Sequence, residues 1–333
     1  MTQNGAAFRC LLMTDFAEDL FQKHNIPVQI EYGGWINGRV AYTEQQMIHH
    51  INRSQINLAI IEVDEIRRQV IAACPSLRII ASMRANPVNV DLEAAQENNV
   101  TVLFTPGRNA QAVAELTLGL ILDLLRHVSA SHDHMARGQW GEKENDPYLL
   151  FRGLELQGKT IGFLGFGEVG QATARLLQGF NASLLVYDPY QPETLLKDYH
   201  ATPTDLQTLF RTSDIITLHA SLNSKTRGMV GANLLHTMKP NSVLVNTARA
   251  GLVDREALFQ ALSSGWLAAA ALDVHYDEPP SPGDPLLSLP NVLATPHIGG
   301  ATREVITRGS EMVITDLARL LNGEKPFHAA TRP

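Results

Sequence analysis

The 333-residue chain contains little cysteine and no excess of basic residues. Its two cysteines, Cys10 and Cys74, cannot form a disulfide framework, so we expect a cytoplasmic protein in which both are small core residues. The formal net charge is -7 at pH 7. Nucleic acids and anionic membranes bind concentrated Lys and Arg, so neither is expected as a partner.

Long apolar runs are also absent. The most apolar segment, residues 116–125 (LTLGLILDLL), is short and contains Asp123, so it predicts a buried helix and not a membrane span. The N-terminus lacks a basic region followed by a long apolar stretch, so no signal peptide is expected.

What the chain does contain is a regular alternation of short Leu-rich or β-branched runs with amphipathic segments of helix length. This pattern predicts an α/β protein with parallel sheets, and the chain length favours two domains. Helical candidates such as 43–53 and 91–99 lie between the runs of the first third, which predicts a small doubly wound sheet. Its strand candidates are 9–15, 28–34, 57–63, 77–83 and 100–107.

A second series of six short apolar runs follows a long helical segment at about 109–130 and a polar, turn-rich segment at 138–148. Six strands fit a second doubly wound sheet of the dinucleotide-binding kind. A last helix, predicted over 303–321, is expected to return to the first domain. We therefore expect a discontinuous domain of 1–107 and 303–333, a domain of 108–302 inserted in it, and a poorly ordered tail at 323–333. The six runs are 160–167, 183–189, 214–220, 242–248, 269–275 and 291–297.

The first run of the second series leads into a glycine-rich turn, TIGFLGFGEVG, with Gly165, Gly167 and Gly170. After a strand and before a helix, these glycines allow a tight turn, approach of the backbone to a pyrophosphate, and close packing of helix on strand. The helix start at Glu168 and Val169 then offers free N–H groups to phosphates. The arrangement predicts a dinucleotide site.

Asp188 ends the next strand candidate, twenty-one residues after Gly167. A carboxylate at this place accepts the ribose hydroxyl groups and repels a 2′-phosphate, which favours NAD over NADP. An isolated Asp-Pro pair is also typical of a simple turn. The strand, glycines, helix and second strand in this order favour the cofactor interpretation.

Four later strand ends carry polar groups, and the carboxyl ends of parallel strands meet at one edge of a sheet. Arg249 stands just beyond one strand, where its guanidinium could bind a carboxylate at two points. Glu278 lies on a proline-bounded loop, and His297 follows Pro296. A histidine beside a carboxylate makes a general acid that stays protonated near neutral pH. We expect no metal site.

These blocks resemble the D-isomer-specific 2-hydroxyacid dehydrogenase family along nearly the whole chain. The resemblance rests on TPGRNAQAVAELT, the glycine turn with its aspartate, VNTARAGLVD, ALDVHYDEPP and ATPHIGGAT, all in family order. It implies catalytic roles for Arg249, Glu278 and His297, with a contact from Asp273 to the nicotinamide carboxamide. It also implies a homodimer built partly on the 109–130 helix. The NAD site would be completed by Thr226 and by the backbone around Glu168, Val169, Ala220 and Thr247.

The resemblance implies that hydride passes between nicotinamide and C2 of a small anionic 2-hydroxy or 2-oxo acid. Many members have a glycine-rich loop where this chain has SMRANPVNVD (82–91), which carries Arg84 and Ala85 at the expected substrate site. Pro87 removes a backbone donor there. Arg84 favours a substrate with a second anionic group, or else is a solvated rim residue. His275 stands where the family usually has an aromatic residue, and no role is predicted for it.

Three alternatives share this fold. A formate dehydrogenase would pair the histidine with Gln, which Glu278 argues against. A phosphite-type dehydrogenase would use the same three catalytic side chains. A corepressor-like protein that senses NAD(H) would bind the nucleotide with little turnover, but the complete catalytic set argues against it. No segment after residue 321 resembles a regulatory domain.

Overall fold

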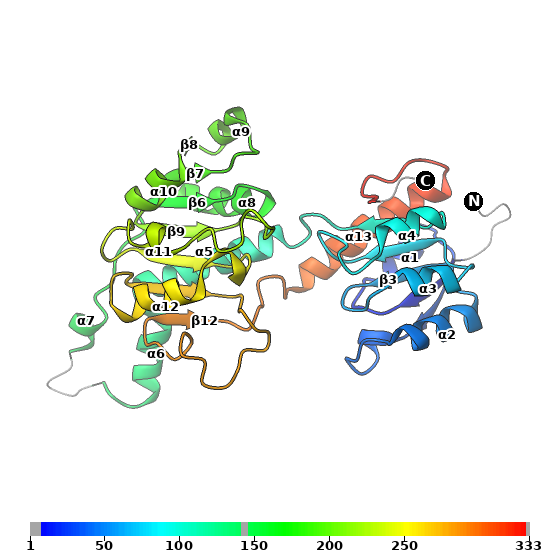
Figure 1. The fold of residues 1–333 in the computed structure, drawn as a ribbon, viewed down its shortest axis with the longest axis horizontal. Coiled ribbons are helices and arrows are strands. Elements are labelled where there is room, and N and C mark those ends of the chain that lie inside the picture. Colours follow the sequence, from blue (N-terminus) through cyan, green and yellow to red (C-terminus); the bar gives the residue numbers. More distant parts are fainter. Residues whose placement is uncertain (1–7, 141–145, 331–333) are drawn as a thin grey trace. The chain divides into compact units, whose positions relative to one another are not determined.

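The computed structural model describes residues 8–140 and 146–330 (Figure 1). The chain folds into two compact units. One contains the residues up to Arg108 together with those from Thr302 onward, and the other is Asn109–Ala301. Each unit is built around its own parallel sheet, so the predicted α/β fold class is confirmed.

The first unit contains a five-stranded sheet with the strand order β2-β1-β3-β4-β5. All five predicted runs form strands, and every pairing between them is parallel. The strand order reverses between β1 and β3, so loops at the carboxyl edge can converge there. The strands are β1 (Phe8–Leu12), β2 (Val28–Tyr32), β3 (Leu58–Ile61), β4 (Ile79–Ser82) and β5 (Thr101–Phe104).

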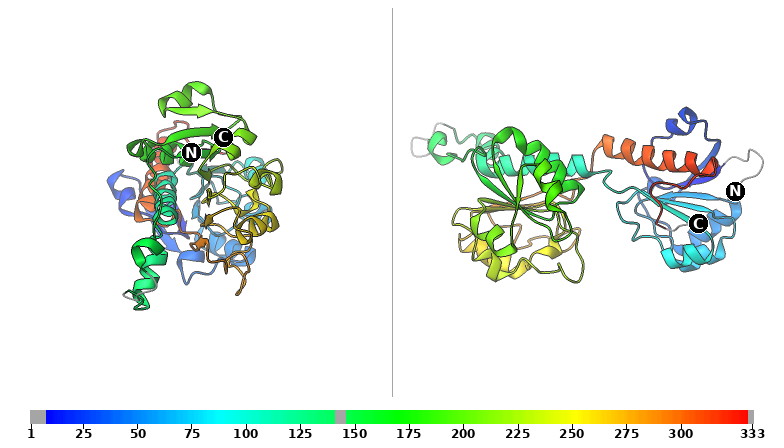
Figure 2. Two further views of the ribbon diagram at one scale, coloured as in Figure 1. Left: turned by 90° about the vertical axis from the view of Figure 1, so that its left-hand side faces the viewer. Right: turned by 90° about the horizontal axis from the view of Figure 1, so that it is seen from above.

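Helices cover both faces of this sheet because successive strand residues point to opposite sides. Leu11 packs with α2 (Glu44–Ser54), α3 (Arg68–Ala73) and α4 (Leu92–Glu97), whereas its neighbours Cys10 and Leu12 pack with the helices of the other face. Those helices are α1 (Asp19–Lys23) and α13 (Arg303–Leu321), and Figure 2 shows α13 along its side of the sheet. Each fully buried aliphatic side chain contributes about 1.5–3 kcal/mol.

Both cysteines are free and buried, as predicted. Burial, and secondarily the charge of Glu18, raises the pKa of the Cys10 thiol far above its ordinary value. Burial alone raises the pKa of Cys74 to about 11. Neither thiol therefore provides a nucleophile near neutral pH.

The predicted disorder of the tail is wrong as far as residue 330, and residues 331–333 lie outside the described part of the chain. Ala329 forms an antiparallel bridge with Leu103 of β5. Asp316 on α13 accepts hydrogen bonds from the backbone N–H groups of Phe327 and His328, at 2.6 and 3.1 Å. Asp316 is 1% exposed, and a buried carboxylate requires such partners, so the tail is held in place.

The second unit contains a seven-stranded parallel sheet in the order β12-β11-β10-β9-β6-β7-β8. The prediction of six strands missed β8 (Ala201–Pro203), a three-residue edge strand that ends in proline and carries no apolar run. The order reverses between β6 and β9, the usual place of a dinucleotide. The other strands are β6 (Thr160–Leu164), β7 (Ser183–Tyr187), β9 (Ile215–Leu218), β10 (Val243–Asn246), β11 (Ala269–Leu272) and β12 (Val292–Ala294).

The helix predicted at 109–130 is in fact two helices, α5 (Ala110–Arg126) and α6 (Val128–Ala136). His127 separates them with a left-handed φ of 55°, a conformation that ends a helix. In the polar segment 138–148, residues 141–145 lie outside the described residues. Asp146 then caps the short helix α7 (Pro147–Leu150).

The remaining helices cover the two faces of the second sheet. Helices α5 and α8 pack on one face, while α10, α11 and α12 pack on the other. Within the described ranges, no helix combines the length and apolarity needed to cross a membrane. The helices are α8 (Glu168–Leu177), α9 (Glu193–Asp198), α10 (Leu206–Thr212), α11 (Ala232–Leu235) and α12 (Arg255–Ser263), with 3-10 turns at Gly34–Ile36, Gln178–Phe180 and Ala250–Leu252.

Candidate active site

The glycine-rich turn lies at the point where the strand order of the second sheet reverses. Gly165 follows β6 and has a φ of +91°, which L side chains rarely adopt. A Cβ atom on Gly165 would lie 2.6 Å from the backbone nitrogen of Ala220, which follows the neighbouring strand β9. Both the backbone conformation and the close approach therefore require glycine here.

Gly167 and Gly170 lie at the start of α8 and differ in the space around them. A Cβ atom on Gly167 would meet nothing within 4 Å, whereas one on Gly170 would lie 2.9 Å from the Gly165 carbonyl oxygen. Gly167 is the N-cap of α8, and no side chain caps the helix. The first N–H groups of α8, at Glu168 and Val169, therefore have no helical acceptor and carry partial positive charge. This cradle fits the pyrophosphate of a dinucleotide.

Asp188 lies directly after β7 and holds the glycine turn. One carboxylate oxygen accepts a hydrogen bond from the Phe166 N–H at 2.7 Å, and the other accepts from the Tyr190 N–H at 2.9 Å. The bond from Tyr190 closes the simple turn expected of an Asp-Pro pair. The bond from Phe166 links Asp188 to the glycine turn of the predicted cofactor site. Because a carboxylate oxygen accepts more than one hydrogen bond, Asp188 retains capacity for ribose hydroxyl groups.

The structure brings Glu278 and His297 together. The Nδ1 atom of His297 lies 2.9 and 2.8 Å from the two carboxylate oxygens of Glu278. The side chains are 44% and 42% exposed, so a small molecule can reach them. With Nδ1 held by the carboxylate, Nε2 is the nitrogen left to exchange a proton with a substrate.

The carboxyl group of Glu278 stays ionised in this arrangement. Partial burial alone would raise its pKa, but the hydrogen bonds from the His297 ring and the His275 N–H oppose this effect. The charges of both imidazoles act in the same direction as those bonds. The pKa of Glu278 is therefore lowered.

Asp273 anchors the loop that carries His297. It is 1% exposed, and its Oδ1 accepts from the Thr295 hydroxyl at 2.6 Å and from the Ile298 N–H at 2.8 Å. Its Oδ2 accepts from the Gly299 N–H at 2.8 Å. These three bonds give Asp273 a structural role in addition to the predicted cofactor contact.

His275 bonds both loops of the pair, although the sequence predicted no role for it. Its backbone N–H donates to Glu278 at 3.1 Å, and its Nε2 lies 2.9 Å from the Thr295 carbonyl oxygen. The signal available in the sequence was its position two residues after Asp273, at the end of the strand candidate 269–275.

The other predicted residues of the second unit lie at the same edge but bond elsewhere. The exposed Arg249 donates to the Ala248 carbonyl at 2.6 Å; no hydrogen bond or ion pair joins it to the Glu278–His297 pair within residues 146–330. The Thr247 hydroxyl lies 2.9 Å from that of Thr117, and Thr226 donates to the Ser221 carbonyl at 2.7 Å.

His219 lies beside the glycine turn as a neutral side chain. Its Nε2 is 3.0 Å from the Thr217 hydroxyl, while its Nδ1 is buried without a hydrogen bond among the described residues. Burial lowers the pKa of the His219 imidazole to about 3, so the ring adds no charge to this edge at pH 7.

Arg84 and Ala85 lie in the first unit, directly after β4. The Nε of the half-buried Arg84 donates to the Glu62 carbonyl, and the Thr105 N–H donates to the Arg84 carbonyl at 2.9 Å. The Glu62 carboxylate is paired with Arg108 and accepts from the Thr14 hydroxyl. This pairing neutralises Glu62 and leaves Arg84 as a cation. The sequence did not single out Glu62 or Arg108.

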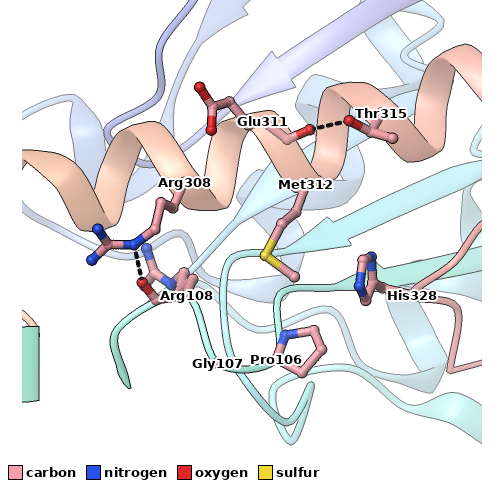
Figure 3. Close-up of a pocket in the computed structure, with 8 residues that line it drawn as sticks. All are labelled: Pro106, Gly107, Arg108, Arg308, Glu311, Met312, Thr315 and His328. Atoms are coloured by element: carbon pink, nitrogen blue, oxygen red, sulfur yellow. Dashed lines mark hydrogen bonds between the residues drawn. The ribbon is translucent and has the colours of Figure 1, made fainter. Parts of the chain in front are cut away.

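A surface pocket of about 300 Å³ also lies in the first unit (Figure 3). Residues 106–108, His328 and one side of α13 line it, and Arg308 there donates to the Arg108 carbonyl at 2.9 Å. None of these residues is a predicted site residue. In the described chain, no group of three or more His, Cys, Asp or Glu side chains could hold a metal ion.

The chain is similar in sequence to proteins of a known family. Residues 118–299 match the family model described as D-isomer specific 2-hydroxyacid dehydrogenase, NAD binding domain. The chain is 40% identical to the protein YoaD of Bacillus subtilis over 284 residues, which cover 84% of this chain and 81% of YoaD.

Two further relatives carry names with different substrates. A glyoxylate reductase of Thermofilum pendens is 37% identical, over 85% of this chain and 83% of its own. A D-3-phosphoglycerate dehydrogenase of Methanocaldococcus jannaschii is 33% identical, over 91% of this chain and 57% of its own. This chain thus matches little more than half of that longer protein.

Solved structures share the fold over nearly the whole chain. The TT0316 protein of Thermus thermophilus is similar with a TM-score of 0.81 and 31% identity, covering 97% of this chain and 100% of its own. The D-mandelate dehydrogenase of Rhodotorula graminis is similar with a TM-score of 0.85 and 26% identity, covering 98% of each chain.

Proposed function

The chain belongs to the D-isomer-specific 2-hydroxyacid dehydrogenase family, and we propose that it transfers hydride between NAD(H) and C2 of a small anionic D-2-hydroxy or 2-oxo acid. The observation that carries this proposal is the Glu278–His297 pair, which lies at the carboxyl edge of the sheet that also holds the glycine turn. The edge therefore offers a proton donor and a phosphate cradle in one unit.

Arg249, Glu278 and His297 divide the chemistry in this proposal. Arg249 is exposed and retains guanidinium donors, so it can bind the substrate carboxylate at two points. In the direction of reduction, Nε2 of His297 gives its proton to the oxygen on C2. Glu278 holds the ring by Nδ1 and favours its protonated form. Bound NADH supplies the hydride.

The match of residues 118–299 to an NAD-binding domain supports a dinucleotide cofactor. The proposed cofactor is NAD and not NADP, because the Asp188 carboxylate repels a 2′-phosphate. The remaining contacts are the backbone around Glu168, Val169, Ala220 and Thr247, with Thr226 and Asp273. In this assignment residues 108–302 form the NAD-binding domain, and residues 1–107 with 303–333 form the substrate-binding domain.

We propose that a second anionic group of the substrate binds Arg84, beside the exposed Ala85. The Nε bond to Glu62 directs the guanidinium, and its terminal nitrogens form no hydrogen bond with any described residue. Such a fork recognises a carboxylate or phosphate. Phosphohydroxypyruvate carries this extra group, whereas glyoxylate does not.

A homodimer is the proposed assembly. Helices α6 and α7 expose large apolar side chains, which a second copy of the chain would cover. They are Val128, Met135, Tyr148, Leu149 and Leu150, each at least 50% exposed.

The test is NADH consumption with glyoxylate, hydroxypyruvate and phosphohydroxypyruvate, for the native protein and for His297→Ala. The variant should lose roughly 10²–10⁴-fold in kcat while its affinity for NADH stays near that of the native protein. The exposed His132→Ala is the matched control. NADH binding without consumption of any 2-oxo acid would instead support a nucleotide-sensing protein, and turnover of phosphite alone would support a phosphite-type dehydrogenase.

A further inference from the structure

His275 bonds the Glu278 carboxylate and also the loop that carries His297. Its backbone N–H holds the Glu278 carboxylate at 3.1 Å. Its ring Nε2 lies 2.9 Å from the carbonyl oxygen of Thr295, two residues before His297. One residue thus fixes the acid directly and the histidine through its loop.

The Thr295 carbonyl controls the backbone at His297. The His297 N–H donates to this same carbonyl at 2.9 Å, closing a tight turn, and His297 has a left-handed φ of 54°. A non-glycine residue in this region is strained and persists only where its surroundings hold it. Asp273 fixes the Thr295 hydroxyl and the amides after His297, but it does not bond this carbonyl. The His275 ring supplies that bond.

We propose that His275 is a positioning residue, which holds the Thr295 carbonyl and thereby the ring of His297 against Glu278. The proposal rests on the proposed function, in which His297 gives the proton. A phenylalanine at this position would fill a similar volume but could not donate the bond.

The first test compares His275→Phe with His275→Gln. Phenylalanine keeps the ring volume and the backbone N–H but removes the ring donor, whereas the amide nitrogen of glutamine can take the place of Nε2. Because small misplacements of a catalytic group are costly, His275→Phe should lower kcat roughly ten- to a hundredfold with KM for the 2-oxo acid nearly unchanged. His275→Gln should restore most of the loss.

Three kinetic outcomes would overturn the proposal. They are native kcat in His275→Phe, an equal loss in both variants, and a rise in KM with unchanged kcat. If His275→Phe does not fold, His275→Asn replaces it. The asparagine nitrogen corresponds to Nδ1 and cannot reach the Thr295 carbonyl, so the contrast with glutamine remains.

A second readout does not depend on activity. The Nδ1–H of His297, held by Glu278, should give a low-field imidazole proton signal in the resting protein, identified by its loss in His297→Ala. This signal should shift or broaden in His275→Phe and return in His275→Gln; an unchanged signal in His275→Phe would refute the positioning role. If His297→Ala retains full turnover, the proposed function fails, while this signal still decides whether His275 positions His297.

Discussion

A Cβ atom on Gly165 would lie 2.6 Å from the backbone nitrogen of Ala220, fifty-five residues later in the chain. The contact joins the ends of β6 and β9, where the strand order reverses. It brings the turn before α8 against the end of the neighbouring strand. Gly165 is therefore required by the fold, whereas Gly167, which looks the same in the sequence, has open space around it.

Gly165→Ala and Gly167→Ala should therefore fail in different ways. Gly165→Ala meets backbone atoms and a left-handed φ, so it should lose at least about 1–3 kcal/mol of unfolding free energy. Gly167→Ala has open space and should fold normally, but its methyl group should weaken NADH binding by roughly tenfold or more. Thermal unfolding and NADH fluorescence titration measure the two effects. Gly179→Ala, also in open space, is the control, and native NADH affinity in Gly167→Ala would count against the cradle.

Asp188 should decide between NAD and NADP. Asp188→Ser removes the charge that repels a 2′-phosphate, so the ratio of kcat/KM for NADH over NADPH should fall roughly tenfold or more. Asp188→Asn keeps an oxygen for one backbone N–H and serves as the matched variant. It should lose the same discrimination with less loss of stability. An unchanged ratio in both variants would leave Asp188 as a turn residue only.

The pH dependence should follow the Glu278 carboxyl. Because its pKa in the folded protein lies below 4.5, the unfolded chain takes up the proton first as the pH falls. The stabilisation is thus complete above pH 4.5 and is lost as the pH falls through the lower, folded value. The acid limb that Glu278 contributes to kcat/KM should likewise lie below pH 4.5.

Glu278→Gln should remove that limb and lower kcat at neutral pH by roughly ten- to a hundredfold, since the imidazolium form loses its partner. Measurement of kcat/KM and of unfolding from pH 9 down through the acid range well below pH 4.5 tests both statements. Glu155→Gln, at an exposed site, should behave as the native protein. An acid limb that persists unchanged in Glu278→Gln would assign it to another group.

Replacement of Arg84 should change KM by different amounts for substrates with and without a second anionic group. Arg84→Ala should raise KM for phosphohydroxypyruvate by roughly ten- to a hundredfold, because it removes hydrogen bonds to a charged group of the substrate. It should change KM for glyoxylate, which lacks that group, by less than about threefold. The exposed Arg53→Ala, in the same unit, controls for loss of charge. Equal changes for both substrates would make Arg84 a rim residue without selectivity.

The elements that the sequence predicted well are those with a strong local signal. The central runs of both sheets are apolar on both faces because both sheets are covered on both sides, whereas the edge strand β2 alternates apolar with exposed polar residues. β8 was missed because three residues ending in Pro203 bury little. The break at His127 and the order of the tail were missed because a single left-handed residue and the acceptor Asp316 leave no periodic pattern.

The sequence by itself determined the order of the elements, the glycine turn and the residues of each strand end, since these depend on local spacing. The tertiary structure alone decided which of those ends meet. β11 and β12 pair with Leu272 opposite Ala294, and this register places Asp273 and His275 beside the loop of His297. Hydrogen bonds across that register, between residues some twenty positions apart, arise from the alignment of two parallel strands, which no local pattern encodes.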